Sequence, residues 1–147
     1  MWKVRDVMTP DPYAMHDADD LYLARSIMQL GRIRHIPIVD DRNHFSGLVT
    51  HRDILEATVS KLAEVDHSTQ AELDASIPIE AIKRTDVITI APETSLREAA
   101  EILFKHKYGC LPVVDGETLV GILTEADFLK LTMQLMDSLE PEDPNDA

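Results

Sequence analysis

Hydrophobic and polar positions follow the same order twice along the chain. A short extended run opens each half, at 12–15 in the first and at 87–90 in the second. Apolar residues with spacings of three and four follow, at Leu21, Ala24, Ile27 and Met28 in the first half and at Leu96, Ala99, Ala100 and Leu103 in the second. This spacing places each set on one face of an α-helix, so the pattern predicts a strand and then a helix in each half.

Each predicted helix follows a residue that is suited to cap it. Asp19 or Asp20 stands before the first helix, and Ser95 stands before the second with Glu98 three residues further on. The spacing of Ser95 and Glu98 is that of a capping box, in which side chains accept hydrogen bonds from first-turn amides that have no partner in the helix. Both helices are therefore expected to begin directly after these caps.

Two further strands follow each helix and form a β-hairpin. These strands are expected at 36–39 and 47–49 in the first half and at 111–114 and 121–123 in the second. The last strand of each half leads directly into another helix. Each half is thus a β-α-β-β-α repeat, and the chain belongs to the mixed α/β (α+β) class.

The two halves also share short motifs. H-I-P-I-V-D at 35–40 corresponds to C-L-P-V-V-D at 110–115, and G-L-V-T-H-R-D at 47–53 corresponds to G-I-L-T-E-A-D at 121–127. A repeat of this length is usually one supersecondary unit that completes its core against its twin. The predicted organisation is a first repeat at 1–58, a helical linker at 59–76, a second repeat at 77–136 and a disordered acidic tail at 137–147.

Composition and charge exclude several classes of protein. The chain is 44% hydrophobic and 28% charged, as is typical of globular proteins. Its net charge of −13 argues against sequence-independent binding of duplex nucleic acid, which requires a basic surface. Neither a signal-peptide core nor an apolar run long enough to span a membrane is present. Cys110 is the single cysteine and is expected in the core or a pocket, so a reducing cytoplasm is the expected location.

No set of residues carries a recognised catalytic pattern. The six histidines show no metal-ligand spacing, and the five glycines form neither a phosphate loop nor a dinucleotide-binding motif. We therefore expect no enzyme activity, no metal and no obligatory cofactor. An enzymatic alternative such as nucleotide hydrolysis would be indicated by turnover that is lost in Asp53→Ala or Asp127→Ala.

Because both motifs recur in register, the chain resembles a tandem pair of cystathionine β-synthase-type (CBS) domains, or Bateman module, over about residues 3–136. The resemblance implies that the repeats pack through their sheets with pseudo-two-fold symmetry and bind an adenosyl compound (AMP, ADP, ATP or S-adenosylmethionine) in clefts between them. It also implies a homodimer and a regulatory role. Since no catalytic domain is fused, the regulated protein is expected to be a separate chain. The alternative is a ligand-independent dimerisation or scaffold protein with the same fold.

The Thr-x-x-Asp pairs Thr50/Asp53 and Thr124/Asp127 stand where a strand enters a helix. A carboxylate there can accept two hydrogen bonds from the vicinal hydroxyls of a ribose, while the threonine hydroxyl and first-turn amides face a ribose or phosphate. The same spacing also serves to cap the helix. With the family resemblance, we expect at least one of the two aspartates to contact ribose and to cap its helix as well.

Basic residues distinguish the two repeats. The resemblance implies that Arg34 and His35 reach nucleotide phosphates, because a guanidinium forms strong hydrogen bonds with a polyanion. The aligned residues Gly109 and Cys110 cannot do so, and two unequal clefts are expected. Arg32 and Arg52 add positive charge near the first of them.

An adenine ring requires an apolar slot. The candidate walls are Tyr13, Ala14, Ile33 and Ile36 in the first repeat and Ile88, Thr89, Tyr108 and Leu111 in the second, together with Pro37, Gly109 and Pro112. Most of these residues are equally suited to the core. The resemblance implies composite clefts, in which Asp127 faces the wall of Tyr13 and Ile33 while Asp53 faces the wall of Ile88 and Tyr108.

Overall fold

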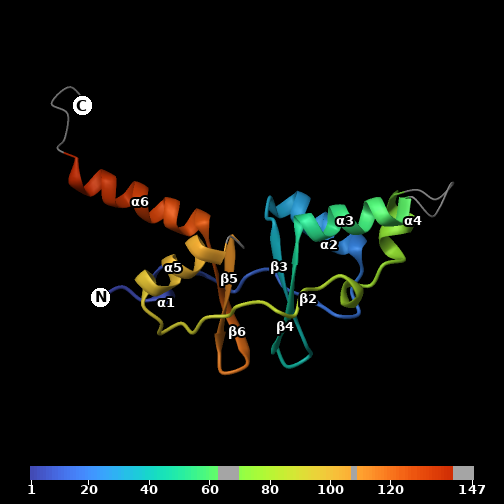
Figure 1. Ribbon diagram of the computed structural model, residues 1–147, viewed down its shortest axis with the longest axis horizontal. Coiled ribbons are helices and arrows are strands. Elements are labelled where there is room, and N and C mark those ends of the chain that lie inside the picture. The colour runs from blue at the N-terminus through green and yellow to red at the C-terminus, as the bar shows by residue number, and fades with distance from the viewer. Residues whose placement is uncertain (63–69, 107–108, 141–147) are drawn as a thin grey trace.

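In the computed structural model, which describes residues 1–62, 70–106 and 109–140, two three-stranded sheets lie next to one another (Figure 1). The first sheet has the order β2-β3-β4 and contains Met15–His16, His35–Val39 and Phe45–Thr50. The second has the order β1-β6-β5 and contains Thr9–Pro10, Thr118–Thr124 and Cys110–Asp115. The predicted α/β class and the hairpin in each repeat are confirmed.

Helices flank both hairpins (Figure 1). They are α1 (Val4–Val7), α2 (Leu21–Gly31), α3 (His51–Leu62), α4 (Gln70–Ala75), the 3₁₀ helix η1 (Ile79–Ala81), α5 (Leu96–His106) and α6 (Glu125–Leu139). Within the described residues, no helix is long and apolar enough to cross a membrane. Residues 63–69 of the predicted linker and 141–147 of the predicted tail lie outside the described residues.

The predicted helix caps are confirmed. Asp20 caps α2 by accepting a hydrogen bond from the Leu23 amide at 3.0 Å, and the Ser95 hydroxyl accepts one from the Glu98 amide at 3.2 Å. The extended run at 87–90 differs from the expected strand, since only Ile90 pairs with β5. The next donor in that parallel ladder would be Pro92, which has no N–H, so the pairing stops after one residue.

Each repeat begins with a lead-in segment, residues 4–10 in the first repeat and 79–85 in the second, which packs on the other repeat. Val4 of α1 is fully buried in the core of the second repeat, and β1 pairs with β6 of that repeat. Ile79 of η1 is fully buried in the core of the first repeat, where its amide donates to the Asp19 carbonyl at 2.8 Å. The two repeats are therefore joined by an exchange of segments, in which each buries part of its lead-in in the core of the other.

The sheets meet through a small apolar cluster of Leu48, Cys110 and Ile122, with Val87 against it. At the hairpin ends the Phe45 amide donates to the Glu117 carbonyl at 2.9 Å. Cys110 has no exposed surface, and burial raises the pKa of its thiol to about 12. Cys110 is therefore an unreactive thiol buried between the two sheets. A position in the core agrees with what its sequence context predicts.

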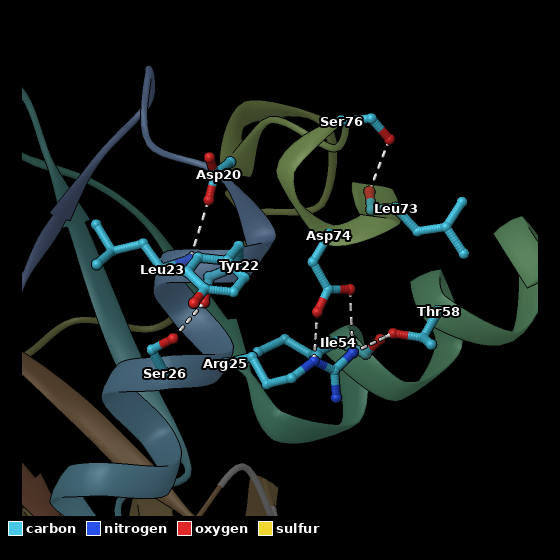
Figure 2. Close-up of polar contacts among 10 residues, drawn as sticks. All are labelled: Asp20, Tyr22, Leu23, Arg25, Ser26, Ile54, Thr58, Leu73, Asp74 and Ser76. Carbon is cyan, nitrogen blue, oxygen red and sulfur yellow. Dashed lines mark hydrogen bonds and ion pairs between the residues drawn. The ribbon is translucent and has the colours of Figure 1, made fainter. Parts of the chain in front are cut away.

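Helix α4 is attached to the first repeat by a buried ion pair. Figure 2 shows the guanidinium of Arg25 on α2 pointing toward Asp74 on α4 and Thr58 on α3. Arg25 Nε donates to Asp74 Oδ2 at 2.7 Å and Nη2 to Thr58 Oγ1 at 2.5 Å, and Asp74 is only 1% exposed. The residue equivalent to Arg25 in the second repeat is Ala100, so this attachment belongs to the first repeat alone.

Candidate ligand-binding cleft

A cleft of about 1030 Å³ lies between the two repeats and is lined by residues of both. The predicted site residues that line it are Tyr13, Ile33, Arg34, His35, Thr50, Gly109 and Thr124. The strand order brings them together, because β3 begins beside the end of β4, with His35 opposite Thr50. In the second repeat, Cys110 at the start of β5 lies opposite Thr124 at the end of β6.

The first helix at the cleft, α3, has in its first turn an aspartate whose two carboxylate oxygens both accept hydrogen bonds. Asp53 Oδ2 accepts hydrogen bonds from the amide and the hydroxyl of Thr50, both at 2.9 Å. Asp53 Oδ1 accepts one from Arg84 Nε at 2.8 Å, and Arg84 Nη2 lies 2.8 Å from the same oxygen. The carboxylate, 8% exposed, therefore caps α3 and also pairs with a cation from the lead-in of the second repeat.

The second helix, α6, has in its first turn an aspartate that accepts hydrogen bonds from two uncharged residues, Thr9 and Thr124. Asp127 Oδ2 accepts from the Thr124 amide at 2.9 Å, with the Thr124 hydroxyl at 3.3 Å. Asp127 Oδ1 accepts from the hydroxyl of Thr9 at 2.9 Å, and the residue is 6% exposed. Both aspartates thus cap their helices as expected, and each is contacted by the lead-in of the other repeat.

Positive charge gathers in the cleft although the chain is strongly acidic. Four arginines line it, namely Arg32, Arg34, Arg52 and Arg84, against the two carboxylates of Asp86 and Glu125. The hydrogen bond from Arg84 to Asp53 raises the pKa of the guanidinium above its usual value, so the pair favours the charged form of Arg84. Arg84 is paired with Asp53, and Arg52 Nε lies 3.8 Å from Glu56 Oε1, so Arg32 and Arg34 are the cleft arginines best placed to attract an anionic group.

Apolar residues of both repeats line the cleft, and the predicted adenine-wall residues among them come from the first repeat. Tyr13 and Ile33 line it side by side, since both approach within 4 Å of a side chain built at Gly31. Ile88, the counterpart of Tyr13, packs against the core of the second repeat. Tyr108, the counterpart of Ile33, lies outside the described residues.

The other predicted wall residues do not line the cleft. Ile36, Pro37, Leu111 and Pro112 are buried within their strands, and Ala14 and Thr89 lie in the extended runs at 12–15 and 87–90 without lining the cleft. Neither Asp53 nor Asp127 lines the cleft directly; Thr50 and Thr124 do. The carboxylates therefore lie behind the side chains that contact them.

Thr9 and Arg84 are cleft residues that the sequence reasoning did not single out. The two lead-ins correspond at the 75-residue offset of the repeat, 4–7 with 79–82, and two residues further on the same offset places Thr9 on Arg84. This signal identifies the pair as equivalent. It does not reveal that each reaches the aspartate of the opposite repeat, which follows only from the crossed lead-ins. Among the described residues, no group of three histidine, cysteine, aspartate or glutamate side chains could hold a metal ion.

Comparison with protein families agrees with this geometry. A family model described as CBS domain matches residues 4–60 and 79–133. The chain belongs to the CBS domain family. It is a CBS pair whose two repeats are those inferred from the duplicated motifs.

Relatives of this CBS pair occur alone and within longer proteins. The uncharacterized protein MJ1404 of Methanocaldococcus jannaschii is 28% identical over 136 residues, which is 90% of this chain. The chain spans only 32% of the length of that relative.

Two solved structures have the same fold. The Vibrio cholerae protein AcuB, named for acetoin utilization, is 37% identical, with 96% of this chain and 98% of that chain covered and a TM-score of 0.85. The CBS domain pair of protein MJ0100 is 26% identical, with 90% and 97% covered and a TM-score of 0.75. The MJ0100 structure is a complex with 5′-methylthioadenosine and S-adenosylmethionine.

Proposed function

We propose that this CBS pair is a regulatory module that binds an adenosyl ligand in the cleft between its repeats. The observation that carries the proposal is the combination of a Thr-x-x-Asp helix start, an apolar wall and an arginine cluster in one cleft. The adenosyl ligands held by MJ0100 support the class of compound. The function itself requires no catalysis, and we expect the module to act in the cytoplasm.

Each part of an adenosine nucleotide has a suitable partner in the cleft. Tyr13 and Ile33 offer the apolar surface for an adenine ring. An aspartate behind the threonine of the motif is suited to the ribose hydroxyls, once the side chain now bonded to it moves aside. Arg34 is exposed at the cleft and suits a phosphate, which favours AMP, ADP or ATP over an uncharged nucleoside.

Regulation requires that the ligand prefer one arrangement of the protein over another, because equal affinity for two states shifts nothing. The crossed lead-ins supply a physical connection. A ligand that displaces Thr9 or Arg84 acts on a segment that pairs with the sheet of the other repeat. A partner protein could then read the altered packing of the two repeats.

We also propose that the chain forms a homodimer through its outer helices. Leu129, Met133 and Met136 recur at helical spacing along α6 and are largely exposed, as is Phe104 on α5. Exposed apolar residues along one helix favour association with another protein surface. Light scattering coupled to size-exclusion chromatography should give twice the chain mass, and Met133→Glu should reduce it to one chain mass.

Calorimetric titration with AMP, ADP, ATP and S-adenosylmethionine tests the ligand proposal. We expect at least one of them to bind, and the preferred one to raise the melting temperature because it stabilises the native state. Absence of binding by all of them at millimolar concentration would contradict the proposal.

A scaffold without a ligand is the second candidate, and one observation favours it. Both aspartate carboxylates are already bonded to side chains of the protein itself. A melting temperature that no nucleotide changes, together with an intact dimer, would support this reading over the first.

A further inference from the structure

Thr9 and Arg84 occupy equivalent places in the two repeats but differ in charge. Thr9 lies 75 residues before Arg84, and the same offset relates the two lead-ins. Thr9 pairs with Ile122 on β6, and Arg84 pairs with Leu48 on β4. Both side chains line the cleft, and each contacts the aspartate of the opposite motif. They therefore stand between the cleft and the two carboxylates.

The backbone at Thr9 and at Arg84 lies close against a strand of the opposite repeat. The two positions differ in the contacts that their side chains make. Arg84 exchanges hydrogen bonds with Leu48 at 2.9 and 2.7 Å. A Cβ atom built at Gly47 would lie 2.7 Å from the Arg84 carbonyl, and one at Gly121 would lie 3.0 Å from the Thr9 carbonyl. These contacts favour displacement of the side chain over separation of the segment from its strand.

Displacement at Asp53 requires the separation of an ion pair. The carboxylate has about four acceptor positions, and the amide and hydroxyl of Thr50 together with two nitrogens of Arg84 occupy them. Ribose hydroxyls would replace an ion pair, in which both partners are charged, with hydrogen bonds in which only the carboxylate is charged, so the Coulomb attraction of the guanidinium is lost. The exchange is therefore unfavourable at Asp53.

Displacement at Asp127 exchanges one hydroxyl for another. Thr9 donates a single neutral hydrogen bond, and its hydroxyl can rotate to accept or donate elsewhere. The adenine wall adjoins this lead-in, because Tyr13 follows Thr9 by four residues and lines the cleft with Ile33. The equivalent residue Ile88 packs against the core of the second repeat.

We propose that an adenosyl ligand places its ribose only at Asp127, and that Arg84 closes the equivalent position at Asp53, so that each chain binds one ligand. This inference rests on the proposed function and specifies how many sites it uses. Arg84 acts as an internal occupant of the second ribose position. The two repeats then share a fold, but only the second supplies the aspartate that binds the ribose.

Equilibrium dialysis of the full chain against radiolabelled AMP or S-adenosylmethionine counts the bound ligands. We expect one ligand per chain, and at least tenfold weaker binding in Asp127→Asn. Arg84→Thr, which copies Thr9 into the first position, should raise the count to two. Asp53→Asn added to Arg84→Thr should return it to one.

Two variants serve as controls. Arg84→Lys keeps the cation next to Asp53 and should keep the count at one. Arg97→Thr makes the same exchange at an exposed position on α5, outside the cleft, and should leave binding unchanged. A circular-dichroism melt of each variant verifies that it is folded before its ligands are counted.

Two bound ligands in the unaltered chain, or a count of one in folded Arg84→Thr, would overturn the inference while leaving the proposed function intact. So would binding that survives Asp127→Asn but is lost in Asp53→Asn. Absence of binding in the unaltered chain and in all variants would overturn the proposed function and the inference with it.

Discussion

The two Thr-x-x-Asp helix starts have almost the same backbone and very different electrostatics. Asp53 and Asp127 each accept a hydrogen bond from the amide of their threonine at 2.9 Å. One carboxylate is then paired with a guanidinium and the other with a hydroxyl. The two repeats are alike in the packing of their apolar positions and differ in the polar contacts of these aspartates. Similar backbones therefore do not imply equal sites.

Both repeats exchange their lead-ins, and each lead-in is anchored by one fully buried side chain, Val4 or Ile79. Truncation of these two side chains should lower the free energy of unfolding more than the other substitutions considered. Ile79→Ala should lower the free energy of unfolding by about 3–4 kcal/mol, because it leaves a cavity in a fully buried position. Val4→Ala removes fewer atoms and should cost less. Urea unfolding monitored by circular dichroism measures both.

Hydrogen exchange then tests where each anchor acts. Ile79→Ala should reduce protection in α2 and β3 of the first repeat, and Val4→Ala should reduce it in α5 and β5 of the second. Loss of protection in the repeat that follows each lead-in along the chain would contradict the crossed packing.

The Arg25–Asp74 ion pair is present in the first repeat alone, and breaking it should rank next. Asp74→Ala leaves Arg25 without its carboxylate partner, and loss of one partner of a buried pair usually costs about 3–5 kcal/mol. Arg25 is 23% exposed and can turn partly to water, so we expect about 2–3 kcal/mol in urea unfolding.

The matched control lies in the second repeat. Glu101→Ala breaks the exposed pair with Arg97 on α5 and should cost less than about 0.5 kcal/mol. Equal losses in the two variants would show that α4 is not held by the buried pair.

The repeat could be predicted from the sequence because its signals are local. Apolar spacing, the caps at Asp20 and Ser95 and the two motifs all depend on residues close together in the chain, and the structure agrees with them. Pairing of Thr9 with Ile122 is different, since it joins residues far apart and depends on how the repeats dock. No local pattern distinguishes a lead-in that stays with its own repeat from one that crosses.

The candidate site was predictable only in its outline for a related reason. Tyr13, Ile33 and Arg34 line the cleft as expected, while Leu111 and Ile88 pack in the second core. An apolar residue suits a slot and a core equally, so sequence alone cannot separate the two. Arg84 was missed because its importance comes from the contact with Asp53.

Arg34 provides the next test, since its counterpart in the second repeat is Gly109. Arg34→Ala should weaken phosphorylated adenosine ligands by about 1.5–3 kcal/mol, the usual loss for a hydrogen bond to a charged group. Unphosphorylated adenosine should lose much less. Calorimetry with AMP and adenosine in parallel measures the difference, and equal weakening of both would show that Arg34 does not meet the phosphate.

Gly109 itself gives the smallest expected effect. Its φ of +78° lies in the left-handed region, where a side chain costs roughly 1–2 kcal/mol, and a Cβ atom there would lie 3.3 Å from His35 Nε2. Gly109→Ala should therefore lower the free energy of unfolding by about 1 kcal/mol. Gly31→Ala, with contacts of 3.5 Å or more and no positive φ, should cost nothing or stabilise α2.

If urea unfolding shows no loss for Gly109→Ala, the backbone tolerates a side chain there, and an arginine could stand at this position as it does at residue 34. A loss of the expected size means that the second repeat cannot gain the arginine of the first without strain. The difference between the two ends of the cleft is then set by the backbone at Gly109 as well as by the side chains, and a single substitution would not make them equal.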